Sequence, residues 1–189
     1  MQMTLDGFVA GPNGELDWMT LDFDDKLTER LVSFAASSDT ILMGRKMTEE
    51  FVKYWTDVVK NPKSPRYEFA RMMVDYPKIV FTKTLDESPW PNTVLAKGNI
   101  VDEVNRVKNR VGRDIIVYGG AGFVSSLIKN NLIDEYYFWI NPIAIGNGMT
   151  IFKESGGRVE LKQLDATPYT CGITVHEYLP AKATRATSA

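Results

Sequence analysis

The sequence predicts an α/β fold with a mainly parallel sheet and antiparallel strands added at its C-terminal end. Helix-like and strand-like segments alternate along most of the 189 residues, which is typical of parallel sheets. After residue 134, strand-like segments follow one another without helical periodicity, which favours antiparallel strands. No linker rich in Pro, Ser or Gly interrupts the chain. We therefore expect one domain over residues 1–180 and a disordered tail over residues 181–189.

Capping residues followed by amphipathic spacing predict five helices. The predicted starts are Asp24–Asp25, Gly44, Ser64–Pro65, Asn99 and Gly122. Asp, Ser and Asn at such positions accept hydrogen bonds from first-turn N–H groups, and proline suits the first helical position. The last helix is expected to end at Asn130 and Asn131, because asparagine tolerates the left-handed conformation that ends many helices.

Short apolar segments rich in β-branched and aromatic residues predict the strands. The expected buried, parallel strands are residues 40–43, 78–82, 93–96 and 114–120. The expected antiparallel strands lie within residues 134–146, 158–166 and 171–179. Aromatic residues at 136–139 would occupy both faces of one strand, so we expect them in the core and at a dimer interface.

Composition and charge exclude several functional classes. Lys and Arg total 22 against 24 for Asp and Glu, so no broad basic surface is available for nucleic acid or anionic membrane. No apolar run approaches the ~20 residues that span a bilayer, and the single Cys171 cannot form an internal disulfide. We therefore expect a cytoplasmic protein. His176 is the only histidine and lies in an alternating strand, so the sequence does not support a metal site.

Three predicted strands end in glycine-bearing turns, at residues 6–14, 44–47 and 119–122. Ligands of open α/β sheets bind at the carboxyl ends of strands, so these turns are candidate binding loops. Gly119, Gly120 and Gly122 lead into a helix, where missing side chains let an anion reach N–H groups. Ser125 stands where the dinucleotide fingerprint would have its third glycine. Simple tight turns without a ligand remain the alternative for each segment.

Cations accompany two of the strand ends. Arg45 and Lys46 follow Gly44 at a predicted helix start, where positive charge is unfavourable unless an anion binds there. Thr82 and Lys83 follow the next apolar strand. Several phosphate-reading corners suit a ligand with separated phosphates, such as NADPH. A solvated Arg-Lys pair is the alternative.

With these residues in view, the chain resembles the reductase domain at the C-terminus of bifunctional riboflavin-biosynthesis deaminase-reductases, a family with the dihydrofolate-reductase-like fold. The motifs occur in order: TLDGFVAGPNGELDWM, TILMGRKM, KIVFTKTL, DIIVYGGAGFVSSLIKNNLIDEYYFWINPIAIGNGMTIF and GITVHEY. The resemblance implies three layers, with an eight-stranded, mainly parallel sheet between helices and antiparallel C-terminal strands. It also implies a homodimer, and NADPH bound along the carboxyl ends of the strands.

The resemblance further implies specific contacts. The implied cofactor-binding residues are Ala10, Gly44, Arg45, Lys46, Thr82, Lys83, Gly119, Gly120, Ala121, Gly122 and Phe123. Among these, residues 119–122 would cradle the pyrophosphate, Thr82 and Lys83 would face the 2′-phosphate, and Ala10 would lie beside the nicotinamide. Asp17 and Trp18 would close over the substrate pocket.

Hydride transfer needs positioning and a proton source rather than a protein nucleophile. We rank Asp17 first as the substrate-side acid and Asp22 second, and expect Asp24 and Asp25 to be helix caps. The leading hypothesis is an NADPH-dependent reductase of an aminouracil ribotide or pterin-like substrate. The alternative is a non-catalytic nucleotide-binding or regulatory homodimer on the same fold.

Two features depart from the family pattern. Met47 stands where family members commonly have threonine, so a hydroxyl contact to phosphate would have to come from Thr48 or water. The first strand is reduced to residues 1–4.

Overall fold

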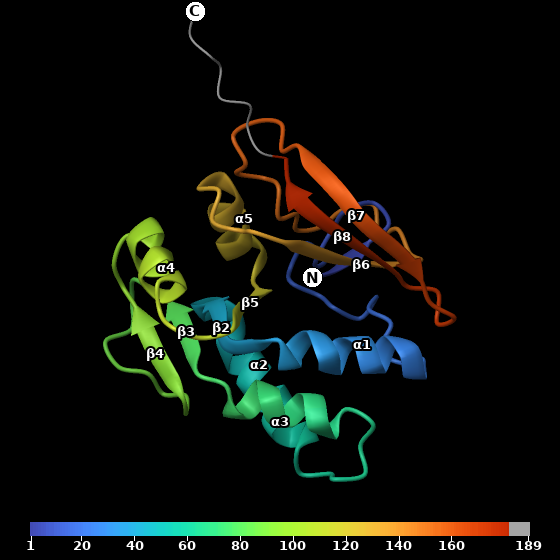
Figure 1. Ribbon diagram of the computed structural model, residues 1–189, viewed down its shortest axis with the longest axis horizontal. Coiled ribbons are helices and arrows are strands. Elements are labelled where there is room, and N and C mark those ends of the chain that lie inside the picture. Colours follow the sequence, from blue (N-terminus) through green and yellow to red (C-terminus); the bar gives the residue numbers. More distant parts are fainter. Residues whose placement is uncertain (182–189) are drawn as a thin grey trace, which may run out of the picture.

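The computed structural model describes residues 1–181 and places their strands in two four-stranded sheets (Figure 1). The predicted tail lies outside the described residues from 182 onward. The first sheet is entirely parallel, in the order β4 (Thr93–Ala96), β3 (Lys78–Phe81), β2 (Ser38–Gly44) and β5 (Asp114–Gly119). The second has the order β1 (Gln2–Thr4), β6 (Tyr136–Asn141), β8 (Thr174–Pro180) and β7 (Leu161–Pro168). In it β1 is parallel to β6, whereas β6, β8 and β7 are antiparallel, as the sequence predicts.

The expectation of one eight-stranded sheet is wrong. Strand β1 has three residues, and its backbone ladder joins it to β6 alone among the described strands. At the seam between the sheets, the Met1 side chain lies beside Gly119 of β5. Its Cε atom would be 3.8 Å from a Cβ built at that glycine. The backbone pairing that would join β1 to β5 in a single sheet is therefore not formed.

Helices cover both faces of the first sheet. The helices α1 (Asp25–Ala36), α2 (Arg45–Val58) and α3 (Tyr67–Asp75) pack on one face, and α4 (Ile100–Lys108) and α5 (Ala121–Lys129) on the other. Successive residues of β2 face opposite layers, as pleating requires. Ile41 and Met43 join the cluster under α1–α3, and Leu42 joins the cluster under α4 and α5. This arrangement is the predicted helix–sheet–helix layering.

Two helices also bridge the seam between the sheets. In α1, Ala35 packs in a cluster of the first sheet, whereas Leu27 packs with Trp139 of the second. In α5, Leu127 packs against the first sheet and Val124 against the second. One helix on each face therefore fastens the two sheets together through apolar contacts.

Capping chemistry locates most helix ends. Asp24 caps α1 through a bond from the Leu27 N–H at 2.9 Å, and Asn99 caps α4. Asn131 adopts the predicted left-handed conformation, with φ at +53°. The predicted start at Ser64 and Pro65 is wrong, because α3 begins at Tyr67. The Ser64 hydroxyl accepts a bond from the Arg66 N–H and so stabilises the preceding turn.

The aromatic strand β6 lies inside the second sheet, between β1 and β8. Tyr136, Phe138 and Trp139 are buried, which confirms their place in the core.

Among the described helices, none is both long and apolar enough to cross a membrane.

Candidate functional site

Two of the three glycine-bearing turns, at residues 44–47 and 119–122, lie at one edge of the first sheet. The strand end at Thr82 and Lys83 lies at the same edge. Strands β3, β2 and β5 are neighbours and run parallel, so their carboxyl ends lie side by side. Gly44 pairs with Phe81 across one ladder, and Met43 pairs with Gly119 across the other. The Phe81 and Phe123 rings are also in contact, with centroids 4.7 Å apart. The fold thus brings together the turn at 44–47, the turn at 119–122 and the start of the segment after β3.

Two helix N-termini open at this edge without side-chain caps. Gly44 is the N-cap of α2 and Gly120 is the N-cap of α5, and both have extended backbone angles. First-turn N–H groups of a helix have no partner within the helix, so they are suited to bind an anion. Arg45 and Lys46 are exposed and form no ion pair with residues 1–181. The edge therefore concentrates unpaired positive charge.

The glycines differ in what the folded chain requires of them. A Cβ at Gly44 would lie 3.0 Å from the Cβ of Phe123, so a side chain there would crowd the close approach of α5 to β2. Gly119 has φ at +124°, and a Cβ there would lie 3.0 Å from the Sδ of Met47. A Cβ at Gly120 or Gly122 would meet no atom within 4 Å. Packing does not require glycine at these two positions, and the space beside them can admit a ligand.

Met47 and Thr48 both lack a free polar group for a phosphate. The Met47 side chain packs in the core cluster under α2 and against Gly119, so it supplies no polar contact. Thr48 is fully buried, and its hydroxyl donates to the Gly44 carbonyl at 3.2 Å. Thr48 therefore does not supply the hydroxyl contact that the family resemblance led us to expect near position 47.

Thr82 shapes the strand end that carries Lys83. Its buried hydroxyl accepts bonds from the N–H groups of Thr84 at 3.1 Å and Leu85 at 3.2 Å. The hydroxyl keeps its own proton available as a donor. Lys83 itself is exposed.

Hydrogen bonds hold the glycine-bearing turn at residues 6–14 to the loop after β6. The Thr4 hydroxyl donates to Asp6 at 2.6 Å, and the other Asp6 oxygen accepts from Ile145 and Gly146 at 3.0 and 2.7 Å. These bonds, the Thr4 hydroxyl first, lower the pKa of Asp6. Ala10 is buried and forms a backbone bridge with Met149. Its position is therefore fixed by the loop between β6 and β7.

The segment from residue 11 to 24 carries the predicted acids. Asp17 and Asp22 are exposed and make no side-chain hydrogen bond within residues 1–181, so no contact joins them to the glycine corners. The Trp18 indole donates to the Glu15 carbonyl at 3.2 Å, within the same segment. The roles of these residues stay predictions. Asp24 is a cap as expected, and bonds from Leu27 first and then Thr170 lower the pKa of its carboxyl.

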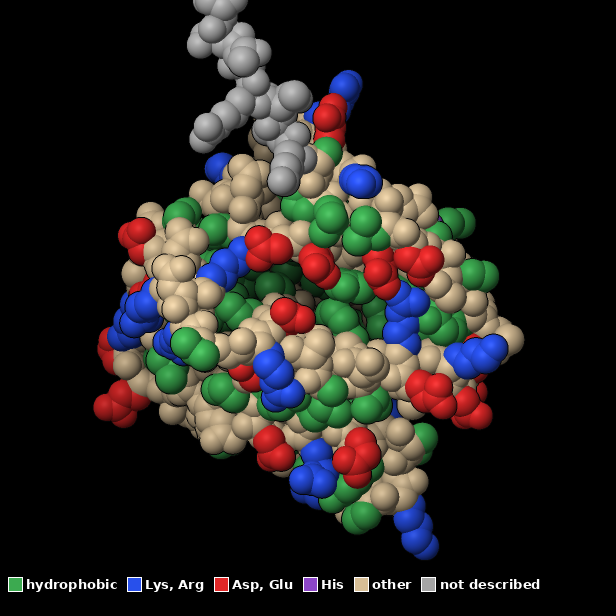
Figure 2. Space-filling view, in the orientation of Figure 1, with side chains coloured by type: hydrophobic (Ala, Val, Ile, Leu, Met, Phe, Trp, Pro, Cys, Tyr) green, Lys and Arg blue, Asp and Glu red, His purple; other side chains and the backbone are tan. Residues whose placement is uncertain are grey.

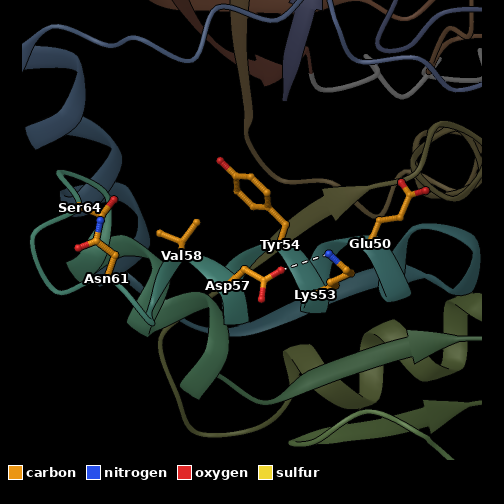
Figure 3. A pocket seen from close by; sticks show the side chains of 7 residues that line it. All are labelled: Glu50, Lys53, Tyr54, Asp57, Val58, Asn61 and Ser64. Carbon is orange, nitrogen blue, oxygen red and sulfur yellow. Dashed lines mark hydrogen bonds and ion pairs between the residues drawn. The ribbon is translucent and has the colours of Figure 1, made fainter.

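A groove of about 610 Å³ follows α2 away from this edge (Figure 3). Its lining residues are Glu50, Lys53, Tyr54, Asp57, Val58, Asn61 and Ser64. Tyr54 and Glu50 stand off one side of the helix, while Lys53 and Asp57 pair with each other at 3.2 Å.

A separate hollow lies on the face of the molecule between α1 and β6. Figure 2 shows hydrophobic side chains in it, with acidic and basic side chains around it.

Sequence reasoning missed Tyr118. It is the last residue before Gly119 on β5, and its ring packs against Phe51 with centroids 4.8 Å apart. Burial first, and then Tyr54, raises the pKa of its phenol above the usual range. Its place directly before two glycines was the available signal, but the residue fits equally well as part of an apolar strand.

Within residues 1–181, no group of three or more His, Cys, Asp or Glu side chains is placed to hold a metal ion.

Comparison with known proteins adds a family to this geometry. The family model of the RibD C-terminal domain matches residues 1–175. The uncharacterized protein YyaP of Bacillus subtilis (strain 168) is 32% identical over 175 residues, which cover 92% of this chain and 88% of YyaP.

Solved structures share the fold. A Shewanella sp. PV-4 protein assigned to riboflavin biosynthesis superposes with a TM-score of 0.70 at 21% identity, over 95% of this chain and 96% of that one. Enterococcus faecalis dihydrofolate reductase, solved with NADP(H), gives a TM-score of 0.61 at 14% identity, over 95% and 93%. The chain therefore has the α/β fold of dihydrofolate reductase, with its strands in two sheets.

Proposed function

The chain belongs to the RibD C-terminal domain family, and we propose that it is an NADPH-dependent reductase of a small heterocyclic substrate. An aminouracil ribotide or a pterin-like compound, of riboflavin- or folate-type metabolism, is the proposed substrate class. The observation that carries the proposal is the pair of uncapped helix N-termini at Gly44 and Gly120, with exposed Arg45 and Lys46 between neighbouring strand ends. A ligand with several phosphates satisfies these groups together.

The residues at this edge fit NADPH by their donor chemistry. The first turn of α5 and the open space beside Gly120 and Gly122 would hold the pyrophosphate. Arg45 and Lys46 would add charge to a phosphate, and Lys83 would pair with the 2′-phosphate. NADPH, when bound, supplies the hydride. The protein's part is to orient the cofactor and substrate and to exclude water from between them.

Cofactor titration tests this function. NADPH should bind more tightly than NADH when cofactor fluorescence is followed, because only NADPH carries the 2′-phosphate. Lys83→Ala should weaken NADPH by about tenfold, the scale of one charge-assisted hydrogen bond, and should leave NADH affinity nearly unchanged. Lys63→Ala, at an exposed lysine in the turn after α2, is the matched control. Absence of binding by either cofactor would refute the proposal.

A non-catalytic nucleotide-binding or regulatory homodimer is the second candidate. It is favoured by one observation: Asp17 and Asp22 are exposed and unengaged, so neither is held as a proton donor. Oxidation of NADPH during a screen of aminouracil, dihydropterin and quinone substrates separates the two candidates, because a binding protein would give no turnover with any of them.

We also propose that the protein forms a homodimer. Strand β7 lies at the edge of its sheet and is mostly exposed, with Leu164 51% accessible. An unprotected edge strand is a ready surface for pairing with a second copy. Sedimentation at micromolar concentration should give twice the 21.3 kDa of one chain, and a monomer would contradict the proposal.

A further inference from the structure

The side chain of Tyr54 lines the groove along α2, and a row of packed rings joins it to Tyr118 at the end of β5. The Tyr54 ring packs on Trp55 with centroids 4.7 Å apart, Trp55 contacts Phe51 at 6.2 Å, and Phe51 contacts Tyr118 at 4.8 Å. The four rings form a continuous row from the groove to the carboxyl end of β5. The two phenols therefore belong to one side of the molecule and to one packed unit.

Both hydroxyl groups have a proton to donate. Every shielded side-chain nitrogen or oxygen within residues 1–181 has a hydrogen-bond partner, and the Tyr118 hydroxyl has none, so solvent or a ligand can reach it. The Tyr54 hydroxyl accepts a bond from Arg66 at 2.6 Å, which leaves its own proton free. Burial and the neighbouring Tyr54 raise the pKa of Tyr118, so its phenol stays protonated at neutral and mildly alkaline pH.

The tyrosines lie between the two halves of the proposed site. Tyr118 directly precedes Gly119, where the proposed pyrophosphate cradle begins. Arg66, which holds Tyr54, also donates to the carbonyl of Leu21, in the segment that carries Asp17. A ring bound beside the tyrosines would therefore have the cofactor edge at one end and the predicted substrate segment at the other.

We propose that the hydroxyls of Tyr54 and Tyr118 form a substrate subsite that donates hydrogen bonds to the carbonyl oxygens of a planar heterocycle. The inference rests on the proposed reductase function and assigns the polar contacts that Asp17 and Asp22 do not provide. Phenylalanine in place of Tyr118 would keep the row of rings and remove only the hydroxyl donor. Phenylalanine in place of Tyr54 would also remove the acceptor of the Arg66 bond. Carbonyl-bearing rings, such as uracils and pterins, are the class that this pair selects.

Binding of two small probes tests the subsite by titration calorimetry. The first probe is 5,6-diaminouracil, and the second is 4,5-diaminopyrimidine, the same ring without the two carbonyl oxygens. Wild-type protein should prefer the uracil, and Tyr118→Phe should lose about tenfold of that preference, as expected for one hydrogen bond to a desolvated acceptor. Tyr54→Phe should lose a similar factor. Tyr136→Phe, on buried β6 of the second sheet, should behave as wild type.

The possible results separate the subsite from the proposed function. Equal probe preference in wild type and Tyr118→Phe, or no binding of the diaminouracil by wild type, would overturn the subsite. Titration of NADP⁺ in the same variants tests the cofactor site alone, and both phenylalanine variants should bind it as wild type does. Failure of NADP⁺ to bind wild type would refute the proposed function, whatever the probes show. Unchanged melting temperatures would show that the variants are folded.

Discussion

At the residue scale, the glycines of the cofactor edge fall into two kinds. Packing in the free protein favours glycine at Gly44 and Gly119, because a side chain would crowd Phe123 or Met47. Gly120 and Gly122 face open space. The family resemblance implied cofactor contacts at all four, with Gly44 in one phosphate-binding turn and the other three in the pyrophosphate cradle. The sequence could not show which of them packing requires, because the close approach of α5 to β2 joins Gly44 to Phe123, 79 residues later in the chain.

Substitution of these glycines gives a first prediction. Gly120→Ala should leave the melting temperature within about 2 °C of wild type but weaken NADPH at least tenfold, because the methyl group enters ligand space. Gly119→Ala is the contrasting variant. It should lower the free energy of unfolding by about 1–3 kcal/mol, since alanine at φ +124° is strained and meets Met47. Wild-type NADPH affinity in Gly120→Ala would contradict the proposed pyrophosphate site beside Gly120.

Lys78 gives a second prediction, on pH. Its buried ammonium donates to the carbonyls of Val74 and Tyr76 at 2.9 and 2.8 Å, and burial lowers the pKa of Lys78 to about 8. Because the unfolded pKa is higher, near 10.4, the unfolded chain binds the proton more tightly, and stability rises as the pH increases from 8 towards 10. Relative to Lys78→Met, wild type should gain about 2 kcal/mol of unfolding free energy between pH 7 and 10.

Urea unfolding at the two pH values measures this gain. The exposed Lys63→Met is the control and should show no pH-dependent difference from wild type. A constant difference between wild type and Lys78→Met at both pH values would show that the lysine titrates normally in the folded protein.

At the element scale, local chemistry explains what could be predicted. Asp24 and Asn99 cap helices because their side chains bond to N–H groups two or three residues away, within reach of a sequence pattern. Ser64 misled the prediction because its hydroxyl stabilises a turn instead of a helix start. The segment from residue 11 to 24 could not be placed from the sequence. Distant partners hold it, since Thr20 bonds to Asn141 and Leu21 bonds to Arg66.

Asn141 gives a third prediction, because it ties three elements together. Its fully buried side chain donates to Gln2 of β1 at 2.7 Å and to the Trp139 carbonyl of β6 at 3.2 Å, and accepts from the Thr20 N–H at 2.9 Å. Asn141→Ala should therefore lower the free energy of unfolding by about 3 kcal/mol, mainly through unpaired polar groups. Chemical denaturation measures the change. The exposed Asn109→Ala should cost less than about 0.5 kcal/mol, and an equally small loss for Asn141→Ala would contradict the network.

At the scale of the whole molecule, the sequence predicted the order of the elements and their parallel or antiparallel character. It did not predict that the strands divide into two sheets. In the structure β1 pairs with β6 and not with β5, and α1 and α5 close the seam between the sheets from both faces. The proposed site follows from the same architecture. The proposed cofactor edge belongs to the first sheet, whereas Ala10 is held by a bridge to Met149 in the loop between β6 and β7.

A crystal structure of the protein with NADPH is the decisive test of cofactor binding at this edge. We expect the pyrophosphate over the N-terminus of α5, within hydrogen-bond distance of the backbone beside Gly120, and the 2′-phosphate within ion-pair distance of Lys83. Arg45 and Lys46 should contact a phosphate oxygen. Crystals grown with millimolar NADPH that hold no cofactor at this edge, or that hold it elsewhere on the molecule, would refute the proposed site.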